Sequence, residues 1–282
     1  MWIHRGTRDV TLNHYRRPLA ALVERVGSDP THWSIRELRQ FVLSYAAEHS
    51  IGQAKSVVTA VRMFLRFLHA HGHCPTDLAP AIPTIARWRL ATLPKYLPTD
   101  QVEQLIGSCD CATPLGLRDR AILLLLAHLG LRANDVAGLK FSDVQWPQGT
   151  LIVAGKNRRQ ARLPLPQEVG DAMLQYIDRG RPPITSDLVF LTTVAPWGPI
   201  SHHVVGRVVV RALQRTGIDA PIRGARLLRH SAATSLLRQG VSLPAIGALL
   251  RHASIETTTI YAKVDGDLLQ HVVMPWPEVY AC

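Results

Sequence analysis

The sequence predicts a mainly α-helical protein of two domains, the second of which also contains a small antiparallel β-sheet. Three observations predict this fold class. Apolar residues recur at helical spacing through most of the chain. A segment with prolines at positions 75, 80, 83, 94 and 98 excludes a continuous helix and is typical of a connector. Two short β-prone segments flank a polar turn at residues 155–160.

The chain is long enough for both domains to fold around cores of their own. It has 282 residues, and a domain usually takes roughly 100 to 200. The proline-rich connector places the boundary near residue 90. The predicted domains are therefore residues 1–90, an N-terminal helical bundle, and residues 91–282, a mostly helical domain with the sheet.

The N-terminal domain is predicted to be a small, basic, all-helical bundle. Its apolar periodicity predicts helices over residues 11–26, from a Ser34 cap to residue 48, and over residues 52–70. The third helix also carries basic side chains, namely Lys55, Arg62, Arg66 and His69.

The C-terminal domain is predicted to be mostly helical with one hairpin. Thr99 or Asp100 can cap a helix over residues 102–106, and a strongly apolar helix over residues 118–129 stops at Gly130. Asn134 with Asp135 marks another helix start. Residues 150–154 and 161–165 predict a hairpin with a basic tip, and helical patterns return at 169–177, 204–216, 228–238 and 243–250.

The charge balance favours a polyanionic partner. Lys and Arg number 32 against 21 Asp and Glu, a formal net charge of +11, and each phosphate neutralised by such a side chain releases counterions. The longest plainly apolar run, residues 121–127, is far shorter than the roughly 20 residues that cross a bilayer. The first residues lack an apolar signal-peptide stretch. We therefore expect a cytoplasmic protein without membrane segments.

The cysteines and histidines predict no metal site. The four cysteines, at positions 74, 109, 111 and 282, form no CxxC pair and no regular framework, so reduced thiols are expected. Histidines at positions 69, 71 and 73 cluster near Cys74, but their spacing follows no structural-zinc pattern and the segment is interpreted as a solvated helix end.

Three segments place side chains of interest at the edges of predicted elements. In the first, Arg132 lies between two predicted helices with Asp135 three residues later, so Asp135 can hold the arginine fork toward a phosphate. The alternative is an arginine that neutralises the carbonyl end of the preceding helix. In the second, Arg226 and Arg229 share a helix face, which indicates either an anion site or an exposed basic face. In the third, Tyr261 is either a nucleophile or an amphipathic core residue.

Together these segments resemble the tyrosine recombinase (phage integrase) family. That family carries, in order, a Gly-Leu-Arg-x-x-Glu/Asp segment, a hairpin lysine, a His-x-x-Arg-His box and a Leu-Gly-His-x-Ser-x-x-Thr-Thr-x-x-Tyr box. The matching residues here are Gly130, Leu131, Arg132 and Asp135, then Gly155 and Lys156, then Arg229 and His230, then His252, Ser254, Thr257, Thr258 and Tyr261. The resemblance covers residues 98–270, and the N-terminal bundle is similar to the family's core-binding domain.

The resemblance implies a site-specific DNA recombinase of the integrase or transposase type. Tyr261 would attack a phosphodiester and form a 3′-phosphotyrosyl bond, so that no cofactor is required. Arg132 and Arg229 would bind the nonbridging oxygens, supported by Asp135. Lys156 would protonate the leaving 5′-oxygen, and His252 would donate a hydrogen bond to the phosphate.

The chain departs from the family pattern at two positions. Arg226 replaces the first His of the His-x-x-Arg box, and an arginine cannot readily accept a proton. We therefore expect slower but not absent cleavage, and we expect Arg226→His to be equal or faster unless Arg226 has a role of its own. His230 is a weak substitute on this argument, because it points about 100° away from Arg229. Arg251 replaces a common Gly and adds positive charge.

The implied partner is double-stranded DNA, bound by a homo-tetramer or a hetero-tetramer with related recombinases. The candidate DNA contacts are Lys55, Arg62, Arg66, Arg158, Arg159 and Arg251. A helix-like segment at residues 265–273 is a candidate for docking on a neighbouring subunit. Two alternatives remain, a relaxing type IB topoisomerase and a DNA-binding protein of the same fold that does not cleave.

Overall fold

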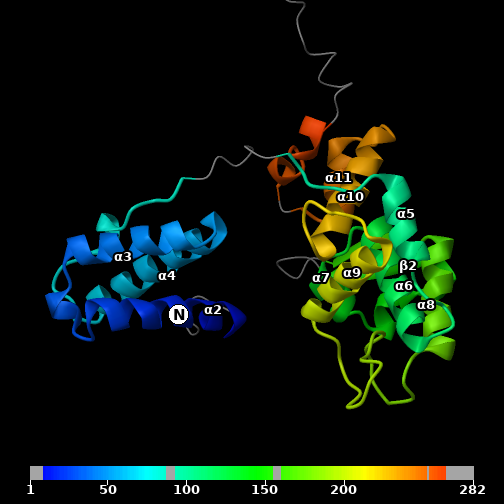
Figure 1. Cartoon of the computed structure of the whole chain (residues 1–282), viewed down its shortest axis with the longest axis horizontal. Helices are drawn as coiled ribbons and strands as arrows, with labels where there is room; N and C mark the ends of the chain where they lie inside the picture. Colours follow the sequence, from blue (N-terminus) through cyan, green and yellow to red (C-terminus); the bar gives the residue numbers. More distant parts are fainter. Residues whose placement is uncertain (1–8, 87–92, 155–159, 253, 265–282) are drawn as a thin grey trace, which may run out of the picture. The chain divides into compact units, whose positions relative to one another are not determined.

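The computed structural model describes residues 9–86, 93–154, 160–252 and 254–264 (Figure 1). The chain divides into two compact units, Met1–Ala91 and Thr92–Cys282. Within the described residues, no helix is both long and apolar enough to span a membrane. No group of three potential metal ligands occurs among them either.

In its described residues, the N-terminal unit is a bundle of three helices followed by a short helical turn. The helices are α2 (Asp9–Val26), α3 (Ile35–Glu48) and α4 (Ile51–Ala70), with 3-10 turns at η1 (Pro30–His32) and η2 (Ala79–Ala81). Ser34 and Glu37 form a reciprocal capping box at the start of α3, and Ser50 and Gln53 form one at the start of α4. These local signals fix where each helix begins.

The core of this unit continues past the helices into the following segment. Leu78, Ala79 and Ile82 pack with the buried faces of α3 and α4. Arg62 on α4 donates from Nη2 to Ile82 O and to Thr84 Oγ1, each at 2.7 Å. The connector predicted from the prolines therefore starts as a packed part of the bundle.

The C-terminal unit contains seven helices and one three-stranded sheet among its described residues. The helices are α5 (Thr99–Gly107), α6 (Pro114–His128), α7 (Ala133–Ala137), α8 (Gln167–Arg179), α9 (His202–Thr216), α10 (Ala225–Arg238) and α11 (Leu243–Leu249). Short 3-10 turns lie at η3 (Phe141–Asp143), η4 (Trp146–Gln148), η5 (Ile255–Thr257) and η6 (Tyr261–Val264).

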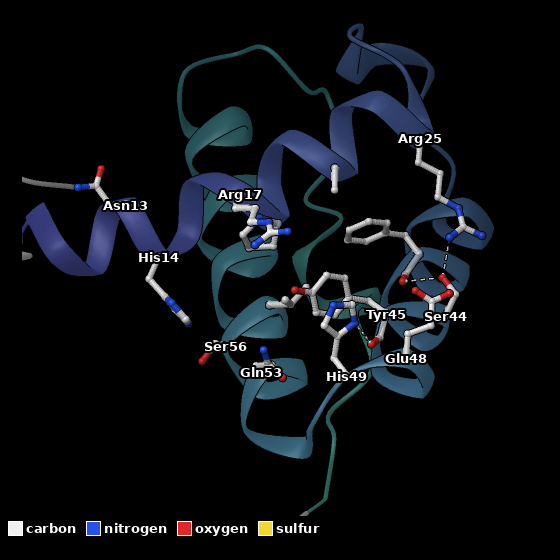
Figure 2. A pocket seen from close by; sticks show the side chains of 14 residues that line it. Asn13, His14, Arg17, Arg25, Ser44, Tyr45, Glu48, His49, Gln53 and Ser56 are labelled. Carbon is white, nitrogen blue, oxygen red and sulfur yellow. Dashed lines mark hydrogen bonds between the residues drawn. The ribbon is translucent and has the colours of Figure 1, made fainter. Parts of the chain in front are cut away.

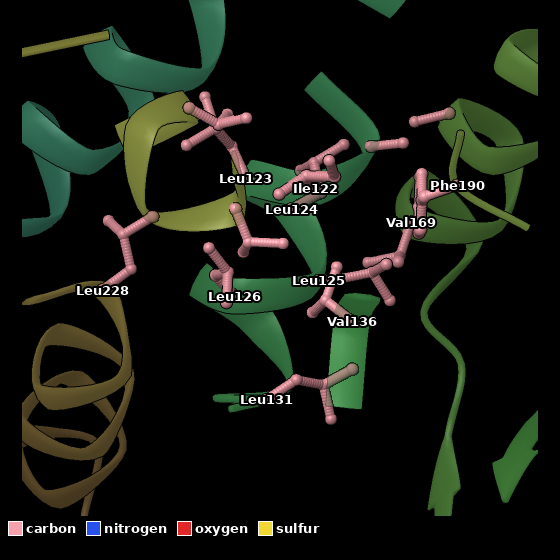
Figure 3. Close-up of a cluster of buried hydrophobic side chains, with 14 of the residues drawn as sticks. Ile122, Leu123, Leu124, Leu125, Leu126, Leu131, Val136, Val169, Phe190 and Leu228 are labelled. Atoms are coloured by element: carbon pink, nitrogen blue, oxygen red, sulfur yellow. The ribbon is translucent and has the colours of Figure 1, made fainter. Parts of the chain in front are cut away.

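Helix α6 is the central element of this unit. The middle of α6 is fully buried at Ile122, Leu123, Leu124, Leu125 and Leu126, so this stretch of the helix is apolar on every side (Figure 3). A helix of this kind must be surrounded by other elements. Accordingly α6 packs against α5, α7, α8, α9 and α10.

A buried ion pair lies at the start of α6. Arg118 Nη2 lies 2.9 Å from Asp119 Oδ1, and Arg211 on α9 reaches Asp119 Oδ2 at 2.7 Å. Arg118 also donates from Nη1 to Leu191 O at 3.1 Å. Asp119 thus ties α9 to α6, and Arg118 ties Leu191 to α6. Arg118 and Asp119 form the buried pair, while the second arginine, Arg211, has a side chain that is 37% exposed, so water solvates part of its charge.

The sheet consists of β1 (Val144–Gln145), β2 (Thr150–Ala154) and β3 (Gln160–Pro164) in the order β1-β2-β3. All pairs are antiparallel, with Leu151 opposite Leu163 and Ala154 opposite Gln160. The predicted hairpin is thus confirmed. Its tip, which contains Lys156, Arg158 and Arg159, lies outside the described residues.

The mainly helical fold class is confirmed, while some boundaries differ. Helix α6 begins at Pro114 rather than residue 118, because Thr113 accepts a hydrogen bond from the Gly116 N–H and proline suits the first helical position. Helix α10 begins at Ala225 rather than residue 228, which places Arg226 in its first turn. The helix expected at residues 265–273 lies outside the described residues.

Candidate active site

Four described segments of the C-terminal unit carry predicted catalytic side chains, while Lys156 on the hairpin tip lies outside the described residues. Arg132 precedes α7, Arg229 lies on α10, His252 follows α11, and Tyr261 begins η6. Helix α10 packs against both α11 and η6, and α6 leads into the Arg132 loop. The contacts below show how these segments are joined.

Arg229 holds the loop after α6 to the loop after α11. Its guanidinium donates from Nη1 to Gly130 O and from Nη2 to Leu250 O. Burial, and then Arg132, lower the pKa of Arg229 to about 10. This value still leaves Arg229 charged near neutral pH, so the arginine is a fixed cation oriented by two backbone carbonyls.

Gly130 makes this junction possible. Its φ is +55°, and a Cβ built there would lie 2.5 Å from Leu250 Cδ2. Both the left-handed backbone and the close approach favour glycine. The Gly in the Gly-Leu-Arg segment is therefore explained by packing against the 250–252 segment.

Arg132 is tied to the same segment. Its Nη2 donates to Arg251 O at 2.9 Å, and its backbone N–H donates to Asp135 Oδ2 at 3.1 Å. Burial, followed by the charge of Arg251, lowers its pKa. The side chain is only partly buried, so part of the guanidinium is open to a ligand.

Asp135 binds a different arginine from the one predicted. Its Oδ2 lies 2.6 Å from Arg251 Nη2, whereas the contact to Arg132 is through the backbone N–H alone. The expectation that Asp135 holds the Arg132 guanidinium is therefore wrong. A carboxylate three residues after an arginine caps the helix that starts there, and the guanidinium is left free for other contacts.

Arg251 is buried rather than displayed on the surface. Its side chain is 5% exposed, and its backbone has a φ of +53°, an uncommon conformation for a residue with a Cβ. Nε and Nη1 are buried and lack a hydrogen-bond partner. Its predicted DNA contact stays a prediction.

His252 is oriented by Thr258. Its Nδ1 lies 2.8 Å from Thr258 Oγ1, and Thr258 is fully buried. Burial, and then the charges of Arg229 and Arg132, lower the pKa of His252 to about 4. The imidazole is thus neutral near pH 7, and its other nitrogen is available for a hydrogen bond.

Tyr261 is both a core residue and a candidate nucleophile. Its ring packs with Ala233, Leu237, Ile246 and Leu250, and only 2% of the residue is exposed. Burial raises the pKa of its phenol, while the charges of Arg229 and Arg226 act in the opposite direction. The two interpretations of Tyr261 are compatible, because the ring is packed while the hydroxyl meets polar groups.

The group that contacts the Tyr261 hydroxyl is His230, which the sequence argument treated as a weak candidate. His230 Nδ1 lies 2.9 Å from Tyr261 Oη. His230 points away from Arg229 around the helix, but η6 lies against the side of α10 that carries His230 and brings Tyr261 to it. The i, i+4 spacing on α10 could have predicted the contact between Arg226 and His230.

Arg226 itself is exposed and donates from Nε to His230 Nε2 at 3.1 Å. Arg229, three residues later, is buried. The two arginines therefore have different environments, and Arg226 reaches Tyr261 through His230.

The N-terminal unit carries a basic stripe on α4. Lys55, Thr59, Arg62 and Arg66 follow one another at intervals of three or four residues, so they lie along one face. Arg66 is exposed and Lys55 half-buried, whereas the Arg62 guanidinium is engaged with the 82–84 segment.

A second feature of this unit is a hollow of about 520 Å³ lined by α2, α3 and the start of α4 (Figure 2). Arg25 donates to Ser44 Oγ at 2.7 Å on one side of it. Next to Ser44, the rings of Tyr45 and His49 stack with centroids 3.8 Å apart. The hollow therefore presents basic and aromatic groups together.

Comparison with known proteins places the chain in a family. The model of the phage integrase family matches residues 95–267. A Sinorhizobium fredii protein, y4rA, which carries an integrase/recombinase description, is 42% identical over 86% of this chain and 59% of its own length. The tyrosine recombinase XerD of Proteus mirabilis is 30% identical over 96% of this chain and 88% of its own length.

The fold is also found in a solved structure. The XerH site-specific recombinase, in a post-cleavage complex with its palindromic difH substrate, matches with a TM-score of 0.79 and 21% identity. The match covers 97% of this chain and 82% of that one. By contrast, this chain spans less than two thirds of y4rA.

Proposed function

The chain belongs to the phage integrase family, and on that basis we propose that it is a site-specific DNA recombinase acting through a 3′-phosphotyrosyl intermediate. The observation that carries the proposal is a cluster of like charges beside the predicted nucleophile. In addition to burial, the charge of Arg251 lowers the pKa of Arg132 and of Arg229, the charge of Arg132 also lowers that of Arg229, and Asp135 is the carboxylate paired with Arg251. A phosphate would supply the missing negative charge.

The arginines bind and orient the scissile phosphate. Arg132 and Arg229 are held through backbone carbonyls, so their remaining donors are fixed in direction before DNA binds. Preorganised donors of this kind stabilise the charge that develops on the nonbridging oxygens in the transition state. His252 adds a neutral ring N–H.

Tyr261 is the nucleophile in this proposal. Its oxygen forms a bond to phosphorus, the bond from phosphorus to the 5′-oxygen breaks, and the phosphotyrosyl bond keeps the energy for rejoining. Lys156 protonates the leaving 5′-oxygen. The scheme uses no cofactor, as the family resemblance implies.

The two domains have separate tasks in the proposal. Residues 91–282 form the catalytic domain, and residues 1–90 form a core-binding domain that holds the DNA on another side. Lys55 and Arg66 on the α4 stripe are the more available phosphate contacts, because the Arg62 guanidinium already binds two oxygens of the same unit. Arg158 and Arg159 would add contacts from the hairpin.

We further propose that the active assembly is a tetramer. Exchange between two duplexes breaks four strands, and each active site supplies one tyrosine, so four subunits are required. A homo-tetramer and a hetero-tetramer with related recombinases satisfy this count equally. Analytical ultracentrifugation with two recombining duplexes distinguishes them, since the first forms with this chain alone.

Covalent trapping tests the proposed function. Nicked duplexes from the DNA flanking the gene are incubated with protein at a concentration that gives full binding, and adducts are resolved on a denaturing gel. We expect an adduct with the wild type and none with Tyr261→Phe. Tyr96→Phe is the matched control, because Tyr96 OH contacts Arg238 on the exposed end of α10, and it should keep the adduct.

The other outcomes identify the alternatives. Tight, salt-sensitive binding with no adduct on any duplex would contradict the proposal and indicate a protein that binds DNA without cleaving it. An adduct accompanied by relaxation of supercoiled plasmid, but without joining of two duplexes, would indicate a topoisomerase.

A further inference from the structure

A row of three side chains leads from the surface of α10 to the predicted nucleophile. Arg226 Nε lies 3.1 Å from His230 Nε2, and His230 Nδ1 lies 2.9 Å from Tyr261 Oη. Exposure falls along the row, since Arg226 is exposed, His230 is half-buried and Tyr261 is buried. Arg226 and His230 are four residues apart on one helix, so this geometry comes from α10 itself.

The contact between Arg226 and His230 determines which ring nitrogen of His230 carries the hydrogen in the contact with Tyr261. A guanidinium has donors and no acceptor, so Arg226 donates its Nε–H and His230 Nε2 must present a lone pair. A neutral imidazole has one N–H, which then lies on Nδ1. Because Nδ1 faces Tyr261, His230 is the donor and the phenolic oxygen is the acceptor.

The surroundings keep His230 neutral. Burial, followed by the charges of Arg226 and Arg229 on the same helix, lowers the pKa of His230 to about 4. His252 also faces the pair, since its ring is parallel to that of Tyr261 at 6.5 Å, and its pKa is also about 4. Near pH 7 the hydrogen bond to Tyr261 therefore comes from the uncharged imidazole of His230, which the charged guanidinium of Arg226 holds in place.

We propose that His230 is a catalytic residue that donates its Nδ1 hydrogen to Tyr261, and that Arg226 is a positioning residue that fixes the tautomer of His230. This inference rests on the proposed recombinase function. It gives Arg226 a positive role in cleavage, so Arg226→His is now expected to cleave more slowly than the wild type instead of equally fast or faster. A histidine there would accept a proton, whereas the arginine makes its neighbour His230 donate a hydrogen bond without giving up the proton.

The proton balance of cleavage follows from this arrangement. Tyr261 loses its phenolic proton to water, its oxygen bonds to phosphorus, and the 5′-oxygen leaves with a proton from Lys156. His230 keeps its Nδ1 hydrogen throughout. Its contribution is that a hydrogen bond to the phenolate is stronger than one to the phenol, which favours the reactive form.

Histidine-selective nitrogen-15 NMR on the full chain tests the tautomer without any DNA. The His230 signal is assigned by its loss in His230→Asn. We expect the Nδ1–H form in the wild type and a mixture of both tautomers in Arg226→Leu, while Arg179→Gln, an exposed arginine on α8, changes nothing. An Nε2–H form in the wild type would overturn the proposal, whatever the cleavage assay shows.

Cleavage kinetics on the trapping duplex test the direction of the hydrogen bond. Asn can donate from nearly the position of Nδ1 but cannot accept a proton, and Leu can do neither. We expect His230→Asn to cleave about 10-fold or more faster than His230→Leu, since hydrogen bonds to charged groups contribute this much. Equally slow variants would show that His230 acts as a base instead.

The pH profile separates a chemical effect from a structural one. Removing a donor to the phenolate raises the pKa of Tyr261, so the rising limb of the rate should move to higher pH in His230→Leu. In His230→Asn it should stay nearer to the wild-type position. A uniform fall of the rate at every pH in His230→Leu would show that the side chain only supports the fold.

A double variant tests whether Arg226 acts through His230. Arg226→Leu should slow the wild type by about threefold to tenfold, and most of that loss should vanish in the His230→Leu background, since coupled residues are not additive. Arg226→His should be slower than the wild type, contrary to the expectation from the sequence. Full additivity of the two losses would show that Arg226 does not act through His230. If the wild type forms no adduct at all, the proposed function fails, and the NMR result still decides the tautomer.

Discussion

The basic side chains of the α4 stripe and those of the arginine cluster differ in how they are held. On α4, Arg66 is exposed and Lys55 is half-buried. In the C-terminal unit, Arg229 is 8% exposed and the Arg251 side chain 5%, and each is bound to backbone carbonyls or to Asp135. The same charge is thus solvated in one region and oriented in the other.

This difference separates binding from chemistry. A solvated cation attracts phosphates from any direction and adds salt-dependent affinity. A buried cation with fixed donors gains from a ligand in one geometry, which is what stabilisation of a transition state requires. Charge count alone therefore does not locate the site, and the following four predictions test the contrast.

The largest expected effect is that of Arg229→Lys. Lysine keeps the charge but cannot donate to Gly130 O and Leu250 O in a fixed fork. We expect the adduct to form about 100- to 1,000-fold more slowly, as when a preorganised donor is lost, with DNA binding nearly unchanged. Single-turnover trapping at saturating DNA measures the rate. A rate within about threefold of the wild type would show that charge alone is sufficient.

Asp135→Asn should have the next largest effect, on folding. The variant leaves Arg251 buried without its carboxylate partner, and breaking a buried pair costs about 3 to 5 kcal/mol. Chemical denaturation without DNA measures the free energy of unfolding. Asp178→Asn is the control, because Asp178 and Arg179 form an exposed pair, for which a loss below about 1 kcal/mol is expected.

Acid should destabilise the C-terminal unit through its two half-buried histidines. The pKa values of His230 and His252 are lowered to about 4 in the fold from an ordinary value of 6.5. The unfolded chain therefore binds protons first, and stability present above pH 6.5 is lost progressively toward pH 4. Thermal unfolding at pH 7 and pH 5 measures the loss. His252→Asn should reduce the dependence, and an unchanged melting temperature in the wild type would contradict the prediction.

The smallest effects are expected on the α4 stripe. Lys55→Gln and Arg66→Gln should each reduce the salt dependence of DNA binding by about one unit of slope and leave the cleavage rate of bound DNA unchanged. Fluorescence anisotropy across a salt series measures the slope. Arg62→Gln should instead lower the stability of the N-terminal unit, since its guanidinium holds Ile82 and Thr84. An unchanged slope for both Lys55 and Arg66 would place the DNA elsewhere.

Much of the fold could be predicted from local signals. Ser34 and Ser50 cap their helices through contacts three residues away, and the run of leucines in α6 predicts a central buried helix. The motif order also placed Arg132, Arg229, His252 and Tyr261 in one site. The start of α10 was harder to predict, because Gly224 precedes the helix and provides no side-chain cap.

The sequence by itself determined which residues lie on each element and which carry charge, because periodicity and capping act within a few residues. Only the tertiary structure decided the partners. Asp135 binds Arg251 across 116 positions of the chain, and Tyr261 meets His230 across 31. Both contacts depend on how the loops after α6 and α11 and the turn η6 pack around α10. Spacing along a helix gives the direction of a side chain, but packing decides what lies in that direction.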